Sequence, residues 1–114
     1  MMDFKVDYDL ESDDLFVYLE GKKSKGAVEA GNFVFDFDEV GNLVAIQIME
    51  ASKTLGILLT KIVELGNIRE FKAEAMNYRN MASVRFTITD DKVSESANIL
   101  VPRIVEGSPV LNLE

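Results

Sequence analysis

The chain has 114 residues, a length that suits one domain, and it contains no His, no Cys and no Trp. These absences exclude a Ser-His-Asp triad, a Cys nucleophile, a His or Cys zinc site, an iron–sulfur cluster and a disulfide framework. The hydrophobic fraction of 47% is typical of a folded domain rather than a disordered chain.

The net charge of −8 lies entirely in the first half of the sequence. Residues 1–50 hold 12 acids and 4 lysines, whereas residues 51–114 hold 8 acids and 8 bases. A negative field repels nucleic acid and anionic membranes and attracts basic proteins and cations. We therefore expect no nucleic-acid partner and no membrane partner, although net charge of this size also serves solubility alone.

The N-terminus carries Asp3 and Asp7 where a secretory signal would have bases followed by an apolar run. No uncharged stretch approaches the roughly 20 residues that a membrane-spanning helix needs. We therefore expect a cytoplasmic location.

Alternating and apolar segments predict strands in hairpins over the first half. Apolar and polar residues alternate from Phe4 to Asp9, which is the period of a half-buried strand. Further strands are expected over residues 15–19, 27–30, 33–38 and 43–50. Turn residues separate these strands, as in the Asp- and Ser-rich segment 10–14.

The strand at 33–38 has the clearest pattern. Its three phenylalanines at 33, 35 and 37 share one face, and Val34, Asp36 and Asp38 share the other. No Lys or Arg alternates with the phenylalanines, so we interpret them as core residues beneath a helix, not as a platform for nucleobases.

Apolar residues at helical spacing predict one long helix over residues 53–65, buried on more than one side. The residues that form this stripe are Leu55, Leu58, Leu59, Ile62 and Val63. Ser52 suits the N-cap, the pair at 66–67 suits the C-terminal stop, and Gly56 indicates close packing against the sheet.

The segment 68–79 fits either a helix face or a strand face. We prefer a strand, because residues 84–89 and 93–101 form a predicted hairpin that needs a third partner. Pro102 is expected to end the last strand, and residues 110–113 to form a tail or a short edge strand.

These elements predict an α+β fold with about eight antiparallel strands in hairpins and a meander, plus the long buried helix. We expect a single domain over residues 1–114, comprising an acidic hairpin region at 1–52, the helix at 53–66 and a meander with tail at 67–114. The meander either extends the first sheet or packs across the helix.

The order of features over residues 3–52 resembles the domain-of-unknown-function family 2283. The pattern comprises Tyr8-Asp9, Asp14-Leu15 with Val17 and Leu19, Asp36-Phe37-Asp38 with Gly41, and Val44 to Ile48 followed by Ala51-Ser52. Ala45 and Gln47 stand where the family has Gly and Glu, so any acid–base or cation role of that Glu is lost here.

The resemblance also carries implications for fold and function. Similarity to longer archaeal members implies a helix followed by a β-meander. Short members are thought to accompany small RNase-type toxins, so the resemblance implies an antitoxin-like protein that neutralises a basic partner.

Five aspartates are the candidate partner-binding residues: Asp9, Asp13, Asp14, Asp36 and Asp38. In the first hypothesis the chain is a non-enzymatic protein-interaction module whose acidic half engages a basic protein. This hypothesis has no catalytic residue and no cofactor. It requires the acidic turn and the face with Asp36 and Asp38 to be exposed.

In the second hypothesis Asp9, Asp14, Asp36 and Asp38 converge as a divalent-metal site or a hydrolytic carboxylate cluster. An EF-hand loop is excluded, because Ser12 occupies its glycine position. A homodimer through helix pairing or edge-strand addition is a third alternative that the sequence leaves open.

Overall fold

The structure, a computed structural model, describes residues 1–102. Within these residues, eight strands form one antiparallel sheet in the order β3-β4-β5-β2-β1-β6-β7-β8. The elements are β1 (Met2–Asp9), β2 (Asp14–Tyr18), β3 (Gly26–Ala30), β4 (Phe33–Phe37), β5 (Leu43–Ile48), α1 (Ala51–Leu58), the 3₁₀ turn η1 (Leu65–Asn67), β6 (Glu70–Asn77), β7 (Met81–Thr89) and β8 (Ser94–Pro102).

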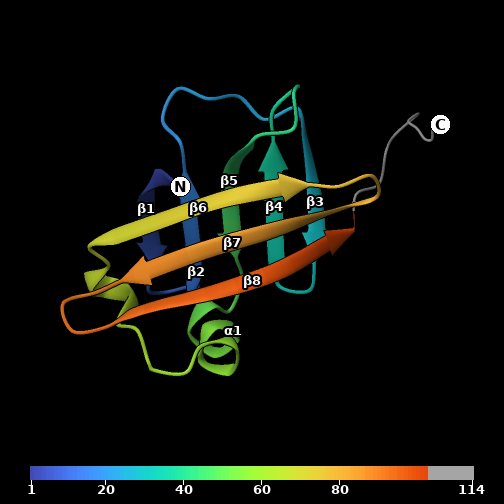
Figure 1. Cartoon of the computed structure of the whole chain (residues 1–114). Coiled ribbons are helices and arrows are strands. Elements are labelled where there is room, and N and C mark those ends of the chain that lie inside the picture. Colours follow the sequence, from blue (N-terminus) through green and yellow to red (C-terminus); the bar gives the residue numbers. More distant parts are fainter. Residues whose placement is uncertain (103–114) are drawn as a thin grey trace.

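Strand β1 joins two layers of this sheet. Its residues 2–4 pair with β6, whereas its residues 5–9 pair with β2. The N-terminal layer, β1 to β5, therefore continues into the C-terminal layer, β6 to β8, which crosses in front of it in Figure 1. The two edge strands, β3 and β8, also contact each other, so the sheet is barrel-like.

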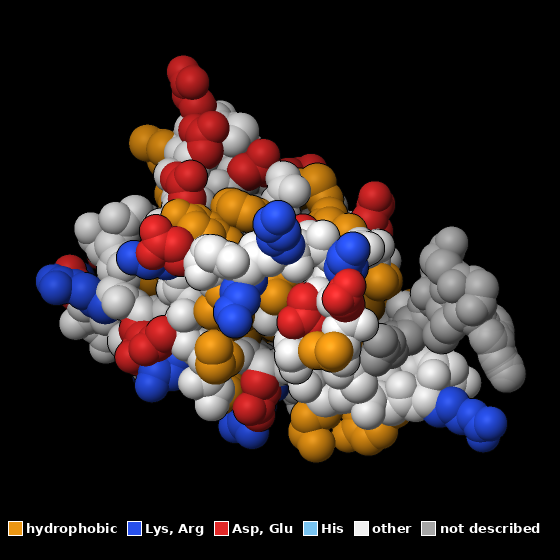
Figure 2. Space-filling view, turned by 90° about the horizontal axis from the view of Figure 1, so that it is seen from above, with side chains coloured by type: hydrophobic (Ala, Val, Ile, Leu, Met, Phe, Trp, Pro, Cys, Tyr) orange, Lys and Arg blue, Asp and Glu red, His pale blue; other side chains and the backbone are white. Residues whose placement is uncertain are grey.

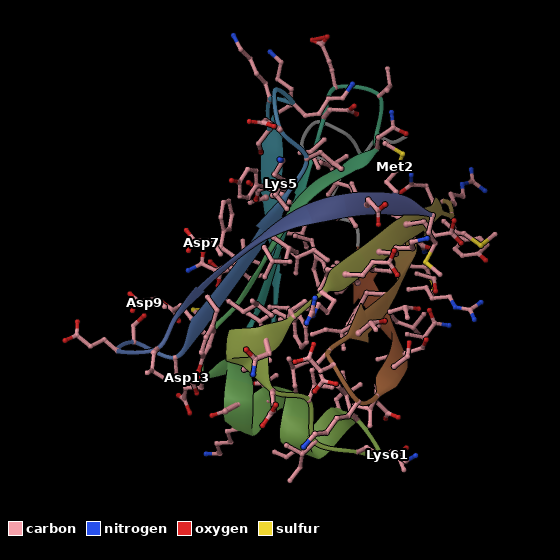
Figure 3. The ribbon with its side chains drawn as sticks, turned by 90° about the vertical axis from the view of Figure 1, so that its left-hand side faces the viewer. Met2, Lys5, Asp7, Asp9, Asp13 and Lys61 are labelled. Carbon is pink, nitrogen blue, oxygen red and sulfur yellow. The ribbon has the colours of Figure 1, made fainter. Side chains whose placement is uncertain are left out.

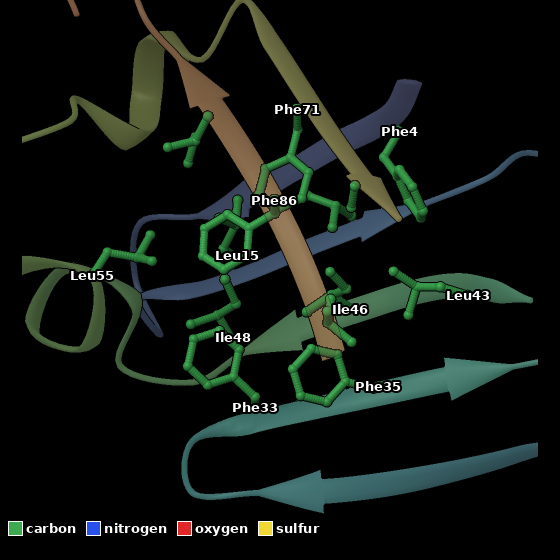
Figure 4. Close-up of a cluster of buried hydrophobic side chains, with 14 of the residues drawn as sticks. Phe4, Leu15, Phe33, Phe35, Leu43, Ile46, Ile48, Leu55, Phe71 and Phe86 are labelled. Atoms are coloured by element: carbon green, nitrogen blue, oxygen red, sulfur yellow. The ribbon is translucent and has the colours of Figure 1, made fainter. Parts of the chain in front are cut away.

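The hydrophobic core fills the space between the two layers (Figure 4). The ring of Phe33 in the N-terminal layer lies 6.3 Å from the ring of Phe86 in the C-terminal layer, and Phe86 stacks on Phe71 at 5.3 Å. Phe35 is also fully buried. The interpretation of the phenylalanines at 33, 35 and 37 as core residues is confirmed, but the expected cover by a helix is replaced by the C-terminal layer, which supplies Phe86. One aromatic cluster holds the layers together.

The prediction of one long buried helix is wrong. Helix α1 has 8 residues, and Leu59 already has extended dihedral angles. Within α1 only Ala51 and Leu55 are buried, whereas Ile57 is 77% exposed. Gly56 is exposed, and a Cβ added there would meet nothing within 4 Å, so the predicted close packing at this glycine is also wrong.

The helix ends early because side chains of the C-terminal layer bind the backbone that follows it. The carboxylate of Glu95 accepts hydrogen bonds from the backbone N–H of Thr60 and of Lys61, at 2.8 and 3.1 Å. The carboxylate of the buried Asp90 accepts one from the N–H of Glu64 at 2.8 Å. These bonds hold residues 60–64 in an irregular path that buries Leu59, Val63 and Leu65 against the core.

The strand preference for residues 68–79 is confirmed, since β6 spans Glu70–Asn77 and is the third strand of the meander. The meander extends the first sheet through the pairing of β1 with β6. Strand β8 reaches Pro102, the last described residue, so the predicted end of the strand there is not tested, and the prediction for residues 110–113 lies outside the described residues.

No helix within residues 1–102 is long and apolar enough to cross a membrane.

Candidate partner-binding face

Asp13 stabilises the start of helix α1. Its carboxylate accepts hydrogen bonds from the Ser52 N–H at 3.1 Å, from the Ser52 hydroxyl at 2.6 Å and from the Tyr8 hydroxyl at 2.5 Å. Its backbone carbonyl accepts the N–H of Ala51 at 2.7 Å. Asp13 therefore caps the helix, and the prediction of Ser52 as N-cap is wrong, because Ser52 lies inside the first turn.

The same hydrogen bonds shift two ionisation equilibria. Donation by Ser52, and then by Tyr8, lowers the pKa of Asp13 below its ordinary value. The hydrogen bond to Asp13, together with burial, raises the pKa of Tyr8 to about 12. Asp13 is thus held as a carboxylate with a structural task.

Asp38 forms the turn between β4 and β5. Its Oδ1 accepts the N–H groups of Val40 and Asn42 at 3.0 and 2.8 Å, and its Oδ2 accepts the Asn42 side-chain amide at 3.2 Å. These bonds, the Asn42 backbone first, lower the pKa of Asp38. Gly41 completes the turn with a φ of 92°, which favours glycine.

Asp9 and Asp14 face each other at the end of the β1–β2 ladder. Asp9 accepts the backbone N–H of Glu11 at 3.0 Å, which is ordinary turn chemistry. This hairpin end lies beside α1, whereas Asp38 follows β4 at the opposite end of the N-terminal layer (Figure 1).

The four carboxylates of the second hypothesis therefore do not converge. Strand β4 runs away from the α1 end, so Asp36 and Asp38 are carried away from Asp9 and Asp14. Within residues 1–102, no group of three or more His, Cys, Asp or Glu residues could hold a metal ion.

A different set of side chains meets on the outer face of the N-terminal layer. In β2, Leu15 and Val17 are fully buried, so Phe16 and Tyr18 point away from the core. The ladder register then defines two rows across β1, β2, β5 and β4. The rows are Asp7–Phe16–Gln47–Val34 and Lys5–Tyr18–Ala45–Asp36, and we call these eight residues the aromatic–acidic face.

Two aromatic rings form the centre of this face. Phe16 and Tyr18 stack with ring centroids 5.2 Å apart and an interplanar angle of 19°. Phe16 remains 40% exposed, although large aromatic side chains usually contribute to a core, and Tyr18 is half-buried. A partly exposed, pre-stacked aromatic pair is a feature typical of binding surfaces.

Carboxylates flank the rings. Asp7 is exposed and directly opposite Phe16 in the register. On the other side Asp36 is half-buried, and this burial raises its pKa, partly offset by hydrogen bonding from Ser24. In the described part of the chain no Lys or Arg pairs with Asp36 or with Asp7.

The only cation among the eight residues of this face is Lys5, which lies 3.4 Å from Glu20. Figure 3 shows Asp7 and Asp9 pointing away from the C-terminal layer, into solvent. Viewed from the end opposite α1, acidic side chains gather on one projecting part, whereas both signs of charge mix elsewhere (Figure 2).

A depression of about 300 Å³ lies at the end opposite α1. Its lining is mainly apolar, with Leu19, Leu43, Val44 and Ala73 among its residues, and it also includes Asp38. The Asp38 oxygens are already bound by turn amides, so they offer little to a ligand in this depression.

Each of the five predicted aspartates now has a position. Asp13 and Asp38 serve a helix cap and a turn, Asp9 and Asp14 lie at the hairpin end, and Asp36 lies on the aromatic–acidic face. Asp9 is exposed, whereas the other four are half-buried, so the exposure that the first hypothesis required is met only in part. The outward-facing pair of Phe16 and Tyr18 was missed, although their alternation with Leu15 and Val17 was the available signal.

Residues 5–52 match the model of the family described as "Protein of unknown function (DUF2283)". The chain belongs to this family, domain-of-unknown-function family 2283. An uncharacterised protein of Methanocaldococcus jannaschii is 43% identical over 113 residues, covering 99% of this chain and 94% of that protein. The resemblance stated from the sequence is therefore confirmed.

A second relative matches a shorter part of the chain. A Methanosarcina mazei protein named "Putative hypoxanthine phosphoribosyltransferase" is 32% identical over 69 residues, covering 60% of this chain and 54% of that protein. No solved structure matches the chain.

Proposed function

We propose that this member of the family is a non-enzymatic interaction module that binds a basic protein through its N-terminal layer. The observation that carries the proposal is the aromatic–acidic face. There the outward-facing Phe16–Tyr18 stack lies between Asp7 and the half-buried Asp36, neither of which has a cationic partner within residues 1–102.

Charge and contact chemistry act together in this proposal. The net charge of −8 over residues 1–50 accelerates the encounter with a basic partner, and the aromatic pair supplies short-range contact once the partner arrives. Partner-binding residues are then Asp36, Asp9 and Asp14 of the predicted set, joined by Asp7, Phe16 and Tyr18. Asp13 and Asp38 contribute indirectly, by shaping the hairpin and the turn beside the face.

The test uses a photo-crosslinking phenylalanine analogue at position 16 of the full chain, expressed in its native host. A matched control carries the analogue at Thr87, on the outer face of the C-terminal layer. Each linked protein is identified, purified, and titrated against the unmodified chain at low and at physiological salt. We expect a basic protein linked through position 16 but not through position 87, with affinity that falls as salt rises.

Two outcomes contradict the proposal. One is that the protein linked through position 16, once purified, does not bind the chain. The other is that position 16 links mainly a second copy of this chain, which would make the face a homodimer interface.

The antitoxin-like role is a narrower form of the same proposal. If the basic partner has nuclease activity, one equivalent of the chain should abolish that activity, and the Phe16→Thr variant should inhibit it less. Threonine keeps strand propensity at this position while it removes the ring. Equal inhibition by both proteins would contradict neutralisation through this face.

A further inference from the structure

The rings and carboxylates on the outer face point to a specific kind of contact. We infer that the aromatic–acidic face recognises arginine side chains of its partner, with the guanidinium plane stacked on the Phe16–Tyr18 pair and its N–H groups donating to Asp7 or Asp36. This inference rests on the proposed function, because it names the chemistry by which that face selects its partner.

Two rings and two carboxylates define the shape of the site. Phe16 and Tyr18 stack nearly parallel along one strand, so each ring covers one face of the other, and Phe16 remains 40% exposed. Asp7 is one strand away on one side, and Asp36 is two strands away on the other, about 10 Å from Tyr18 between Cα atoms. A planar cation on the rings thus has a carboxylate within reach on either side.

One residue of β5 lies between the rings and Asp36. Ala45 lies opposite both Tyr18 and Asp36, and its small side chain is 7% exposed beneath its neighbours. A larger residue here would stand between the aromatic pair and the carboxylate. Alanine has no atom beyond Cβ to separate them.

Arginine suits this face better than lysine does. Both are attracted by the negative field, but only a guanidinium is planar, weakly hydrated and able to stack on a ring while it donates to a carboxylate in its plane. Lysine binds aromatic faces less often than arginine does. A surface of carboxylates alone would show no such preference, so the aromatic pair makes the inference testable.

Lys5 is the competing cation. It lies opposite Tyr18 in the register, and its ammonium is 3.4 Å from Glu20 rather than over the rings. Both partners of this ion pair are more than half exposed, so the pair is weak and its removal is structurally harmless. Removing the Lys5 charge should therefore strengthen cation binding at the face.

The experiment compares two synthetic heptapeptides, acetyl-GRGRGRG-amide and acetyl-GKGKGKG-amide, which carry equal charge. Each is titrated into the full chain while amide chemical shifts are recorded, with the dissociation constant taken from the shift changes. We expect the arginine peptide to bind at least about threefold more tightly, with the largest shifts at residues 7, 16, 18 and 36.

Variants separate stacking from charge. Phe16→Thr should bring the two peptides to equal affinity, and Lys5→Gln should tighten both. Asp36→Asn should weaken the arginine peptide more than Glu11→Gln does. The Glu11 variant removes the same charge from the exposed hairpin tip, away from the rings. Amide spectra of each free variant establish that the sheet is intact.

Equal affinity for the two peptides in the unmodified chain would overturn the inference, as would shifts confined to other surfaces or an arginine preference that survives Phe16→Thr. These results are distinguishable from failure of the proposed function. A basic protein that links through position 16 and binds Phe16→Thr unchanged would contradict arginine stacking alone. An arginine preference without any basic protein partner would contradict the proposed function alone.

Discussion

The outer faces of the two layers satisfy their polar groups in different ways. On the C-terminal layer, hydroxyls pair across β7 and β8: Thr87 with Ser96 at 2.8 Å, and Thr89 with Ser94 at 2.9 Å. On the N-terminal layer, Asp7 and Asp36 flank outward-facing rings with no cation beside them in the described residues. On the first face these hydroxyls pair with each other, whereas on the second face the two carboxylates have no cationic partner within residues 1–102 and are available for the proposed contact with an external cation.

This difference suggests that different residues of a strand serve stability and the proposed binding. Both layers contribute inward residues to one core, so stability depends on both. Their outward residues contribute little to that core, and those of the N-terminal layer are free to serve binding. Substitutions can therefore test the two properties independently.

The largest effect should come from the contact that the layers share. Phe86→Ala removes a fully buried ring that stacks on Phe71 and lies 6.3 Å from Phe33. We expect a loss of about 3–5 kcal/mol in the free energy of unfolding, measured by urea denaturation. Phe86→Leu, which keeps much of the volume, should lose less. A loss below about 1 kcal/mol for Phe86→Ala would contradict a core shared by both layers.

Removal of the helix cap should have the next largest effect and should act within the N-terminal layer. Asp13→Ala loses the bonds to Ser52 and Tyr8 and places alanine at a φ of 58°, so we expect a loss of about 1–2 kcal/mol. Asp13→Asn tolerates this φ and should lose less. The folded-state pKa of Asp13 is lowered, so its carboxylate stabilises the fold at any pH above the ordinary aspartate pKa. This stabilisation is lost as the pH falls through the lowered folded-state pKa.

The same variants provide a spectroscopic check on the cap. Tyr8 should titrate at about 12 in the unmodified chain, and its pKa should fall toward 10.0 when Asp13 is replaced by Asn. The measurement is the pH dependence of the Tyr8 ring carbon shifts. An unchanged Tyr8 pKa in Asp13→Asn would show that burial, rather than the hydrogen bond, governs this titration.

Asp36→Asn should stabilise the fold slightly at neutral pH. Burial raises the folded-state pKa of Asp36, so the favourable contribution of its protonated form is present at low pH and is lost as pH rises through the raised value. The variant should therefore have a higher Tm at pH 7 and about the same Tm at pH 3. A lower Tm at pH 7 would mean that the fold stabilises the ionised Asp36, which contradicts the proposal that this carboxylate binds a partner's cation.

The smallest effect on stability should come from the outer face of the C-terminal layer. Thr87→Val removes one hydroxyl pair from the C-terminal layer but keeps a β-branched side chain, so stability should change by about 0.5 kcal/mol or less. Affinity for the arginine peptide should not change. If this variant weakened peptide binding as much as Phe16→Thr does, the two outer faces would not differ in function.

Much of the fold could be predicted, because the alternation of apolar and polar residues along the chain indicates strands. The period of two from Phe4 to Asp9 and the three phenylalanines of β4 correctly indicate which side of each strand is buried. The concentration of acids in residues 1–50 is likewise a property of the sequence alone. The candidate site was predicted less well, since Asp13 and Asp38 serve a helix cap and a turn, and the aromatic pair of Phe16 and Tyr18 was missed.

Contacts between residues distant in the chain decided the rest. Asp13 caps a helix that begins 38 positions later, and Asp90 and Glu95 bind the backbone that would have continued that helix. Strand order brings Phe16, Tyr18 and Asp36 onto one face and separates Asp38 from Asp14. Local patterns fix which side of a strand meets water, because that depends on neighbouring residues; which side chains meet each other depends on long-range register, which no local pattern encodes.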